Sequence, residues 1–242
     1  MRYGIFSDVH SNLPALEAVF LAYNKESVDE YLCAGDVVGY AANPNECIEL
    51  VKKQAMVTVA GNHDWAAIDL FSTDYFNSVA KEAIIWTRNN LEPAGRYFLG
   101  SLNLVYKNED LTLVHGTLSN PGNFDYMEDT LTALETFRLL DTPVCFVGHT
   151  HVPGVFIKDA AGNLFYSDSV HLHMKEGNQY VVNVGSVGQP RDGNPQAAYC
   201  VYDTKTKEIF IKRVSYDINL TRREIIKVRL PLFLSERLLL GR

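Results

Sequence analysis

Histidine, aspartate and asparagine residues gather in five short segments of this chain, four of which contain a glycine. The segments read Ser-Asp-Val-His at 7–10, Gly-Asp at 35–36, Gly-Asn-His-Asp at 61–64, His-Gly at 115–116 and Gly-His-Thr-His at 148–151. Imidazole together with carboxylate suits zinc, iron, manganese or nickel, whereas carboxylates alone suit magnesium or calcium. These residue types therefore indicate a site for transition-metal ions.

The spacing within two of these segments lets a pair of side chains reach one ion. Asp8 and His10 are two positions apart, and His149 and His151 repeat that spacing. In an extended segment such side chains point the same way. The candidate ligands are Asp8, His10, Asp36, Asn62, His115, His149 and His151. Because one ion needs about four ligands, this set is large enough for two ions that share a carboxylate.

A structural interpretation competes with this one. A single histidine at the end of a strand is more often a satisfied polar residue than a ligand, and one Asp-x-His match is weak. Five such segments, four of which contain a glycine, are hard to obtain by accident. The glycines at 35, 61, 116 and 148 would let the backbone turn tightly at each point.

The elements that must position these residues alternate in the first half of the chain. Apolar patterns predict strands at 2–7, 30–34 and 56–60, with helices at 13–25 and 44–53 between them. Strand, helix, strand, helix, strand predicts a parallel sheet. Ligands bind at the carboxyl ends of strands in such sheets, so segments far apart in sequence can converge there.

The second half is mostly strand. Helices are expected at 74–91, 130–140 and 220–228, and a hairpin is expected from 102–106 and 111–115. Further strands are predicted at 144–148, 155–158, 164–167, 180–184, 198–203 and 209–214. No repeat or linker stands out, so we expect one domain, residues 1–242, built on two sheets.

The amino-acid composition disfavours several classes of function. Lys plus Arg is 22 and Asp plus Glu is 29, a net charge of −7, which makes nucleic acid an unlikely general partner. The 4 cysteines contain no Cys-x-x-Cys pair, so neither a disulfide scaffold nor a thiolate zinc site is favoured. No signal peptide or membrane segment is visible. We therefore expect a cytoplasmic protein with no membrane association.

The motifs SDVH, GDVVG, GNHD, HG and GHTH, taken together, resemble those of the calcineurin-like metallophosphoesterases, from Asp8 to His151. The resemblance implies an α/β fold, a four-layer αββα sandwich of two mixed sheets, with a dinuclear metal centre at one edge. It implies one ion held by Asp8, His10 and His151. It implies a second ion held by Asn62, His115 and His149, with Asp36 bridging the two.

The same resemblance implies that His63 faces the substrate as general acid and binds no metal. Its ordinary pKa, near 6.5, suits an acid at neutral pH. The reaction implied is hydrolysis of a small phosphoester by in-line attack of a metal-bridging hydroxide. The cofactors would be two divalent ions of manganese, iron, zinc or nickel.

Two departures from the family favour a phosphodiesterase. Serine/threonine protein phosphatases of this fold carry an arginine shortly after the Gly-Asp motif and read GNHE, whereas this chain reads GDVVGYAANP and GNHD. A dianionic monoester wants a planar guanidinium clamp more than a diester does. The alternatives are a dinucleoside-polyphosphate or nucleotide phosphohydrolase, a phosphomonoesterase or protein phosphatase, and a catalytically silent scaffold of the same fold.

Each of several further residues has two possible interpretations, one functional and one structural. Asn12 could touch substrate or cap the first helix. Asp64 could support the site or simply begin a helix. The glycines of the segment 185–193 could present N–H groups to an anion, with Arg191 adding charge. That segment could instead be a structural loop in which Arg191 pairs with an acid.

For the remaining candidate residues, a structural role is the better interpretation. His171 and His173 could approach the cleft, but a surface strand or loop fits them better. Tyr40 could stack on a base. The segment 120–128 could form a lid or a contact in a homo-oligomer, although ordinary aromatic packing is the simpler account.

Overall fold

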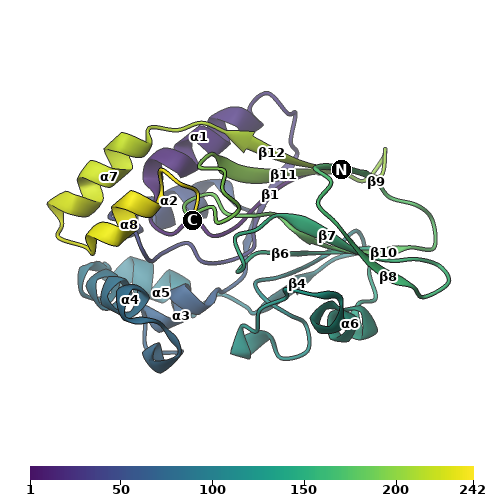
Figure 1. The fold of residues 1–242 in the computed structure, drawn as a ribbon, viewed down its shortest axis with the longest axis horizontal. Coiled ribbons are helices and arrows are strands. Elements are labelled where there is room, and N and C mark those ends of the chain that lie inside the picture. Colours follow the sequence, from purple (N-terminus) through teal and green to yellow (C-terminus); the bar gives the residue numbers. More distant parts are fainter.

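Two six-stranded mixed β-sheets lie at the centre of the computed structural model, which describes residues 1–242 (Figure 1). The first sheet has the order β3 (Val57–Thr58), β2 (Glu30–Cys33), β1 (Arg2–Phe6), β11 (Ala197–Asp203), β12 (Glu208–Val214) and β9 (His171–His173). The second has the order β4 (Val105–Lys107), β5 (Thr112–Val114), β6 (Val144–Val147), β10 (Gln179–Asn183), β7 (Gly154–Lys158) and β8 (Leu164–Ser167). In each sheet three neighbouring strands are parallel and the other neighbours are antiparallel.

The strands alternate their side chains between two apolar layers. In β1, Tyr3 and Ile5 join the core between the sheets, whereas Phe6 joins the core beneath the helices. In β6, Phe146 faces the other sheet and Cys145 faces outward. Because both faces of these strands are covered, they read as continuous apolar runs.

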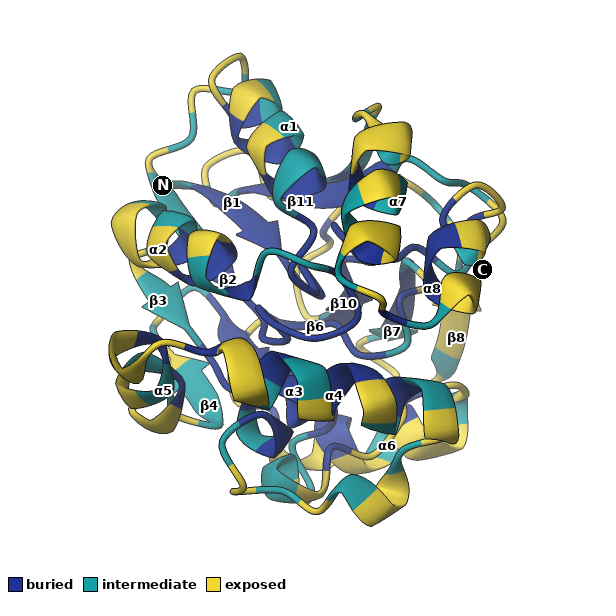
Figure 2. Ribbon diagram, turned by 90° about the vertical axis from the view of Figure 1, so that its left-hand side faces the viewer, coloured by how far each residue is buried: buried dark blue, intermediate teal, exposed yellow.

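Helices cover both outer faces, so the expected αββα sandwich is confirmed. α1 (Leu13–Tyr23) and α2 (Pro44–Gln54) pack on the first sheet, and α6 (Thr130–Leu139) packs on the second. Figure 2 shows α1 and α2 with a buried side inward and an exposed side outward, the pattern expected of amphipathic surface helices. None of the helices combines the length and the apolar character required to cross a bilayer.

The remaining helices cover one end of the sheets. They are α3 (Asn62–Ala66), α4 (Ser78–Asn90), α5 (Pro93–Gly100), α7 (Ile218–Lys227) and α8 (Leu232–Arg237), with single 3₁₀ turns at η1 (Thr73–Tyr75) and η2 (Pro121–Asn123). α4, α7 and α8 meet around the buried ring of Tyr40. This cluster ties the C-terminal segment to the loop that follows β2.

Several boundaries differ from the expectation. The helix expected at 74–91 begins only at Ser78, because the side chain of Asn77 accepts the N–H of Ala80 at 2.9 Å and caps the helix there. The strand expected at 56–60 is reduced to β3. The sequence patterns did not predict α3, α5 or α8, and they left the segment of β9 as either a surface strand or a loop.

Candidate metal centre

All seven predicted ligands, together with His63, are buried and lie in the segments that follow strands; Asn62 and His63 begin the short helix α3. β1, β2 and β3 of the first sheet lead to Asp8, His10, Asp36, Asn62 and His63. β5 and β6 of the second sheet lead to His115, His149 and His151. The parallel strands of both sheets therefore deliver their polar residues to one place.

Asp8, His10 and His151 form the first group. The Nε2 atoms of His10 and His151 are 3.1 Å apart. Asp8 Oδ1 is 3.2 Å from His151 Nε2 and 3.6 Å from His10 Nε2. These three ligand atoms lie within 4.8 Å of one another, as the atoms around one cation must.

Asp36, His115 and His149 form the second group within the same limit. Asp36 Oδ2 is 3.3 Å from His115 Nε2, and His149 Nδ1 is 3.2 Å from that same nitrogen. Asp36 Oδ2 is also 3.6 Å from His10 Nε2, in the first group. A single carboxylate oxygen thus faces both groups. His10, Asp36 and His63 satisfy the 4.8 Å limit as well.

Backbone carbonyls orient three of the imidazoles. The Nδ1 atoms of His10, His115 and His151 lie 3.1, 2.7 and 2.6 Å from the carbonyl oxygens of Val38, Ala34 and Gln189. An Nδ1–H that donates to a carbonyl leaves Nε2 as the free lone pair. This is the tautomer that a metal ligand requires.

Several polar atoms at the centre have no partner within the protein. Asp8 Oδ1, Asp36 Oδ2 and Asn62 Oδ1 are buried and make no hydrogen bond. Unpartnered buried oxygens beside two facing imidazole nitrogens are costly unless a cation lies among them. The donor set, imidazole with carboxylate and amide oxygen, therefore fits divalent transition-metal ions.

Burial and neighbouring charge set the protonation of the carboxylates. Burial opposes ionisation of Asp8 and Asp36, but the surrounding histidines outweigh it, so the pKa of each carboxyl lies below its usual range. Both are ionised at neutral pH, which is the form that binds metal.

The imidazoles divide into two kinds. Burial lowers the pKa of His149 to about 3 and that of His151 to about 4, so both rings are neutral at pH 7. Burial also lowers the pKa of His115, but the carboxylate of Asp36 outweighs it and raises the net value to about 9. Without metal, a proton on His115 therefore balances part of the carboxylate charge.

The backbone at the four residues of the two i, i+2 pairs is not extended. The expectation that an extended backbone points both side chains of a pair the same way was therefore wrong. Asp8, His10, His149 and His151 all have positive φ, at 55°, 51°, 69° and 62°. Left-handed turns bring their side chains together instead. Such conformations are uncommon outside glycine and concentrate at functional sites.

Two glycines make room for the ligands and do not supply tight turns through positive φ. A Cβ on Gly148 would lie 2.0 Å from Ser7 Oγ and 2.4 Å from Asp8 Oδ2, and one on Gly61 would lie 2.1 Å from Asp36 Oδ1. Of the four glycines expected to relieve backbone turns, Gly35 alone has positive φ, at 96°.

The segment 185–193 is a structural loop and not an anion nest. Its glycine N–H groups are used within the protein: Gly185 donates to Asn183 Oδ1 at 2.9 Å and Gly188 donates to the carbonyl of Asp8 at 2.8 Å. Ser186 Oγ donates to the same carbonyl at 2.9 Å. The loop therefore holds the segment that carries Asp8.

Arg191 does not pair with an acid as the structural alternative proposed. Its guanidinium donates to Gln189 Oε1 at 3.0 Å and to the Tyr40 hydroxyl at 3.3 Å, whereas Asp192 pairs with Arg213. Arg191 thus carries a charge with no carboxylate partner, half-buried behind Tyr40.

Asn12 and Asp64 have structural partners. Asn12 is fully buried; its Oδ1 caps α1 through the N–H of Ala15, and its amide donates to the carbonyl of Gly188 at 2.8 Å. No surface of Asn12 is left for a substrate. Asp64 accepts the N–H groups of Val38 and Gly61, each at 3.1 Å, and so joins the loops that carry Asp36 and Asn62.

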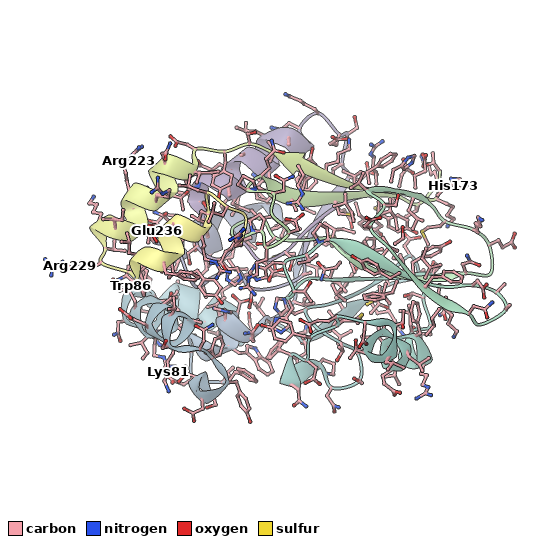
Figure 3. All side chains as sticks on the ribbon, in the orientation of Figure 1. Lys81, Trp86, His173, Arg223, Arg229 and Glu236 are labelled. Atoms are coloured by element: carbon pink, nitrogen blue, oxygen red, sulfur yellow. The ribbon has the colours of Figure 1, made fainter.

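His171 and His173 lie on the edge strand β9, away from the centre. His173 pairs in register with Glu208 of β12, level with the amino end of β1. Figure 3 shows His173 at the end of the molecule opposite α7 and α8. Of the two expected possibilities, a surface strand or a loop, the structure shows the strand.

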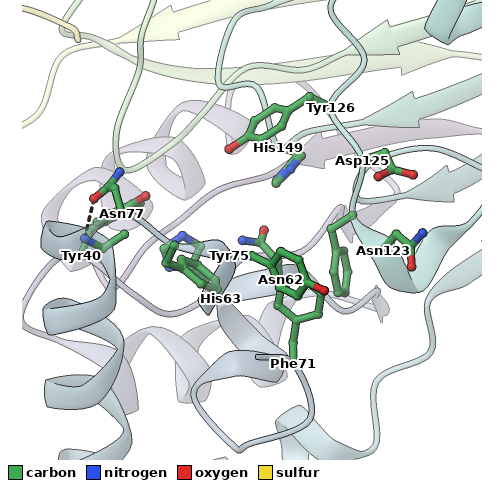
Figure 4. Close-up of a pocket in the computed structure, with 13 residues that line it drawn as sticks. Tyr40, Asn62, His63, Phe71, Tyr75, Asn77, Asn123, Asp125, Tyr126 and His149 are labelled. Atoms are coloured by element: carbon green, nitrogen blue, oxygen red, sulfur yellow. Dashed lines mark hydrogen bonds between the residues drawn. The ribbon is translucent and has the colours of Figure 1, made fainter. Parts of the chain in front are cut away.

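A cleft of about 450 Å³ opens beside the centre (Figure 4). Its lining residues are Tyr40, Asn62, His63, Phe71, Tyr75, Phe76, Asn77, Ala80, Asn123, Phe124, Asp125, Tyr126 and His149. The sequence analysis did not single out Phe71 or Tyr75 for function, although three aromatic residues within 71–76 follow the GNHD motif closely.

His63 forms part of this cleft and packs among rings. Its imidazole centroid is 4.5 Å from that of Tyr40, 4.7 Å from that of His10 and 4.9 Å from that of Phe76. Burial lowers its pKa well below the usual 6.5, so the ordinary value assumed from the sequence does not apply to the ligand-free protein.

Comparison with known proteins identifies the family of this chain. The model of the calcineurin-like phosphoesterase superfamily domain matches residues 1–207. The chain belongs to this superfamily. The metallophosphoesterase structure from Sphaerobacter thermophilus is 40% identical, with a TM-score of 0.89 over 100% of this chain and 99% of that one.

Two further relatives extend the comparison. An uncharacterized protein of Methanocaldococcus jannaschii is 39% identical over 98% of this chain and 97% of its own length. A hypothetical protein from Pyrococcus horikoshii OT3 shares the fold, with 20% identity and a TM-score of 0.80 over 100% of this chain and 98% of that one. The two solved structures cover the whole chain, whereas the family model ends at residue 207.

Proposed function

We propose that this protein is a divalent-metal-dependent phosphodiesterase that acts on a small phosphoester with a two-ion centre. The observation that carries the proposal is the position of Asp36 Oδ2, which is unpartnered, buried and within 3.6 Å of an imidazole nitrogen from each ligand group. A shared carboxylate is what two neighbouring cations need.

The seven ligands divide between two ions in this proposal. Asp8, His10 and His151 would hold one, and Asn62, His115 and His149 would hold the other, with Asp36 between them. Divalent ions bound here would lower the pKa of water and neutralise charge on the phosphoryl oxygens. Manganese, iron, zinc and nickel all suit these donors.

His63 is the proposed proton donor to the leaving oxygen. It lines the cleft, and its Nδ1 is buried without a partner. Burial favours the neutral ring, whereas a phosphate anion bound beside it raises the pKa by charge attraction and loads the proton that the leaving group takes. Gly39 leaves space for the ring, since a Cβ there would lie 2.5 Å from Nδ1.

Charge in the cleft supports a diester over a monoester. No lysine or arginine lines it, and Asp125 adds a negative charge. Arg191 lies behind Tyr40 and already donates to two neutral oxygens. A dianionic monoester would find no guanidinium clamp in this cleft, whereas a singly charged diester needs none.

The test compares two substrates that release the same nitrophenol. We expect protein loaded with manganese to contain about two ions per chain and to hydrolyse bis(p-nitrophenyl) phosphate with a higher kcat/KM than p-nitrophenyl phosphate. A preference for the monoester would overturn the diesterase proposal. Absence of both hydrolysis and metal would overturn the enzyme proposal as a whole.

A further inference from the structure

Two aromatic walls face each other across the cleft. The ring of Tyr126 stacks on His149, with centroids 4.0 Å apart and an interplanar angle of 25°. On the other side Tyr75 stacks on Phe71, with centroids 5.4 Å apart and an angle of 30°. Figure 4 shows Tyr126 and His149 on one side and Phe71 and Tyr75 on the other.

The wall that contains Phe71 packs on a buried aromatic ring, and the two tyrosines remain open to solvent. Phe71 meets the buried ring of Phe124 edge-on at 5.2 Å, and Phe124 meets Trp65 edge-on at 5.6 Å. In contrast, Tyr75 is 81% exposed and Tyr126 is 49% exposed. Exposed aromatic faces on a firm base are well suited to stack on a planar ligand.

Polar groups at the margin of the cleft are free to bind such a ligand by its edge. The side chains of Asn123 and Asp125 are exposed, line the cleft and make no hydrogen bond within the protein. The amide offers donors and an acceptor, and the carboxylate accepts. No lysine or arginine lines the cleft, so a neutral group with a polar edge fits this margin better than a second anion does.

We propose that this cleft is a nucleobase subsite, and that the substrate is a phosphoester of a nucleoside whose base lies between Tyr75 and Tyr126. The inference rests on the proposed function for the position of the phosphoryl group beside His63 and His149. It adds the chemical class of the substituent, which the metal ligands do not determine.

The test uses direct binding to metal-loaded protein by titration calorimetry, so it does not depend on turnover. The probes are adenosine 5′-monophosphate and ribose 5-phosphate, which share the phosphate and the sugar and differ in the base. We expect the nucleotide to bind about 10-fold more tightly, the size of one base–aromatic stack.

Variants show whether the aromatic walls cause that preference. Tyr75→Ala should remove most of it, whereas Tyr75→Phe, which keeps the ring, should retain it. Tyr97→Ala is the matched control, because Tyr97 is 82% exposed on α5 and lies outside the cleft.

The outcomes separate this inference from the proposed function. Equal affinity for the two probes, or a preference that survives both Tyr75→Ala and Tyr126→Ala, would overturn the nucleobase subsite even if bis(p-nitrophenyl) phosphate is hydrolysed. A preference lost in Tyr75→Ala would support the subsite even in a protein that hydrolyses no phosphoester.

Discussion

Asp36 is the residue through which the two ligand groups meet. Its Oδ2 faces both groups, and its Oδ1 accepts the N–H of His63 at 2.8 Å. Asp36→Asn keeps the size of the side chain but removes the charge that the proposed pair of cations would share. We expect loss of both ions together and a fall in turnover of at least about 100-fold, measured by elemental analysis and nitrophenol release.

The exposed carboxylate of Asp141 provides the control for Asp36. Asp141 pairs with Lys107 at the surface, so Asp141→Asn should change neither metal content nor rate. Loss of one ion with full retention of the other in Asp36→Asn would contradict a bridging position.

His63 should act on protons and not on metal retention. His63→Ala is expected to keep both ions and to lose about 10²–10⁴-fold in turnover of diesters with alkoxide leaving groups, with a smaller loss for nitrophenol, which departs without a proton. The measurement is the dependence of kcat on leaving-group pKa. His173→Ala on β9 should match the wild type. A loss of metal equal to that in Asp36→Asn would make His63 a ligand.

At the scale of residues, the sequence predicted which side chains form the centre but not the backbone conformation that brings them together. Residue type and order identified the side chains that meet at the centre. The left-handed conformations of Asp8, His10, Asp36, His149 and His151 could not be foreseen. They depend on backbone bonds to distant segments, such as the donation of His10 N–H to the carbonyl of Asp36 at 3.0 Å.

At the scale of elements, the loop of residues 185–193 positions the loop after β1. A Cβ on Gly188 would lie 1.9 Å from the carbonyl oxygen of Val9, between Asp8 and His10. Gly188→Ala must push that backbone aside. We expect a loss of about 1–3 kcal/mol in the free energy of unfolding and weaker metal binding, measured by denaturation and metal titration.

Gly100 on α5 is the matched site for a glycine-to-alanine change. A Cβ there would meet Ile68 Cδ1 at 3.6 Å, an ordinary contact, so Gly100→Ala should leave metal binding unchanged. Wild-type metal affinity in Gly188→Ala would show that the loop after β1 holds its conformation independently.

The strongly periodic elements were predictable and the short ones were not. α1, α2 and α6 carry several turns of apolar spacing, and β1 and β6 are almost entirely buried. α3, with 5 residues, and β9, with 3 residues, are too short to show a period. β9 exists only because it pairs with β12, a contact that no local pattern encodes.

At the scale of the whole molecule, the centre draws its ligands from both sheets. Asp8, His10, Asp36 and Asn62 come from the first, and His115, His149 and His151 come from the second. Bound ions therefore stabilise the folded chain against the unfolded one. Each ion at about 100 times its Kd adds about 3 kcal/mol, so removal of two ions by chelation should lower Tm by about 10–20 °C. An unchanged Tm after verified metal removal would show that the ligands are held without ions.

The four cysteines should be inert in the folded protein. Cys33, Cys47, Cys145 and Cys200 are all buried and unpaired, and burial raises the pKa of each thiol. We expect no reaction with a thiol reagent at pH 8 and four reactive thiols after denaturation. A thiol that reacts at the same rate in both states would contradict the packing around it.

The outermost strands of both sheets are short. β3 and β9 have 2 and 3 residues, and β4 and β8 have 3 and 4, whereas the central β11 has 7. Each sheet edge therefore exposes few unpaired backbone N–H and C=O groups with which a strand of another molecule could pair. Concentrated solutions of this protein should form few fibrils by addition of strands, because the edge strands are too short to template the strand of another molecule.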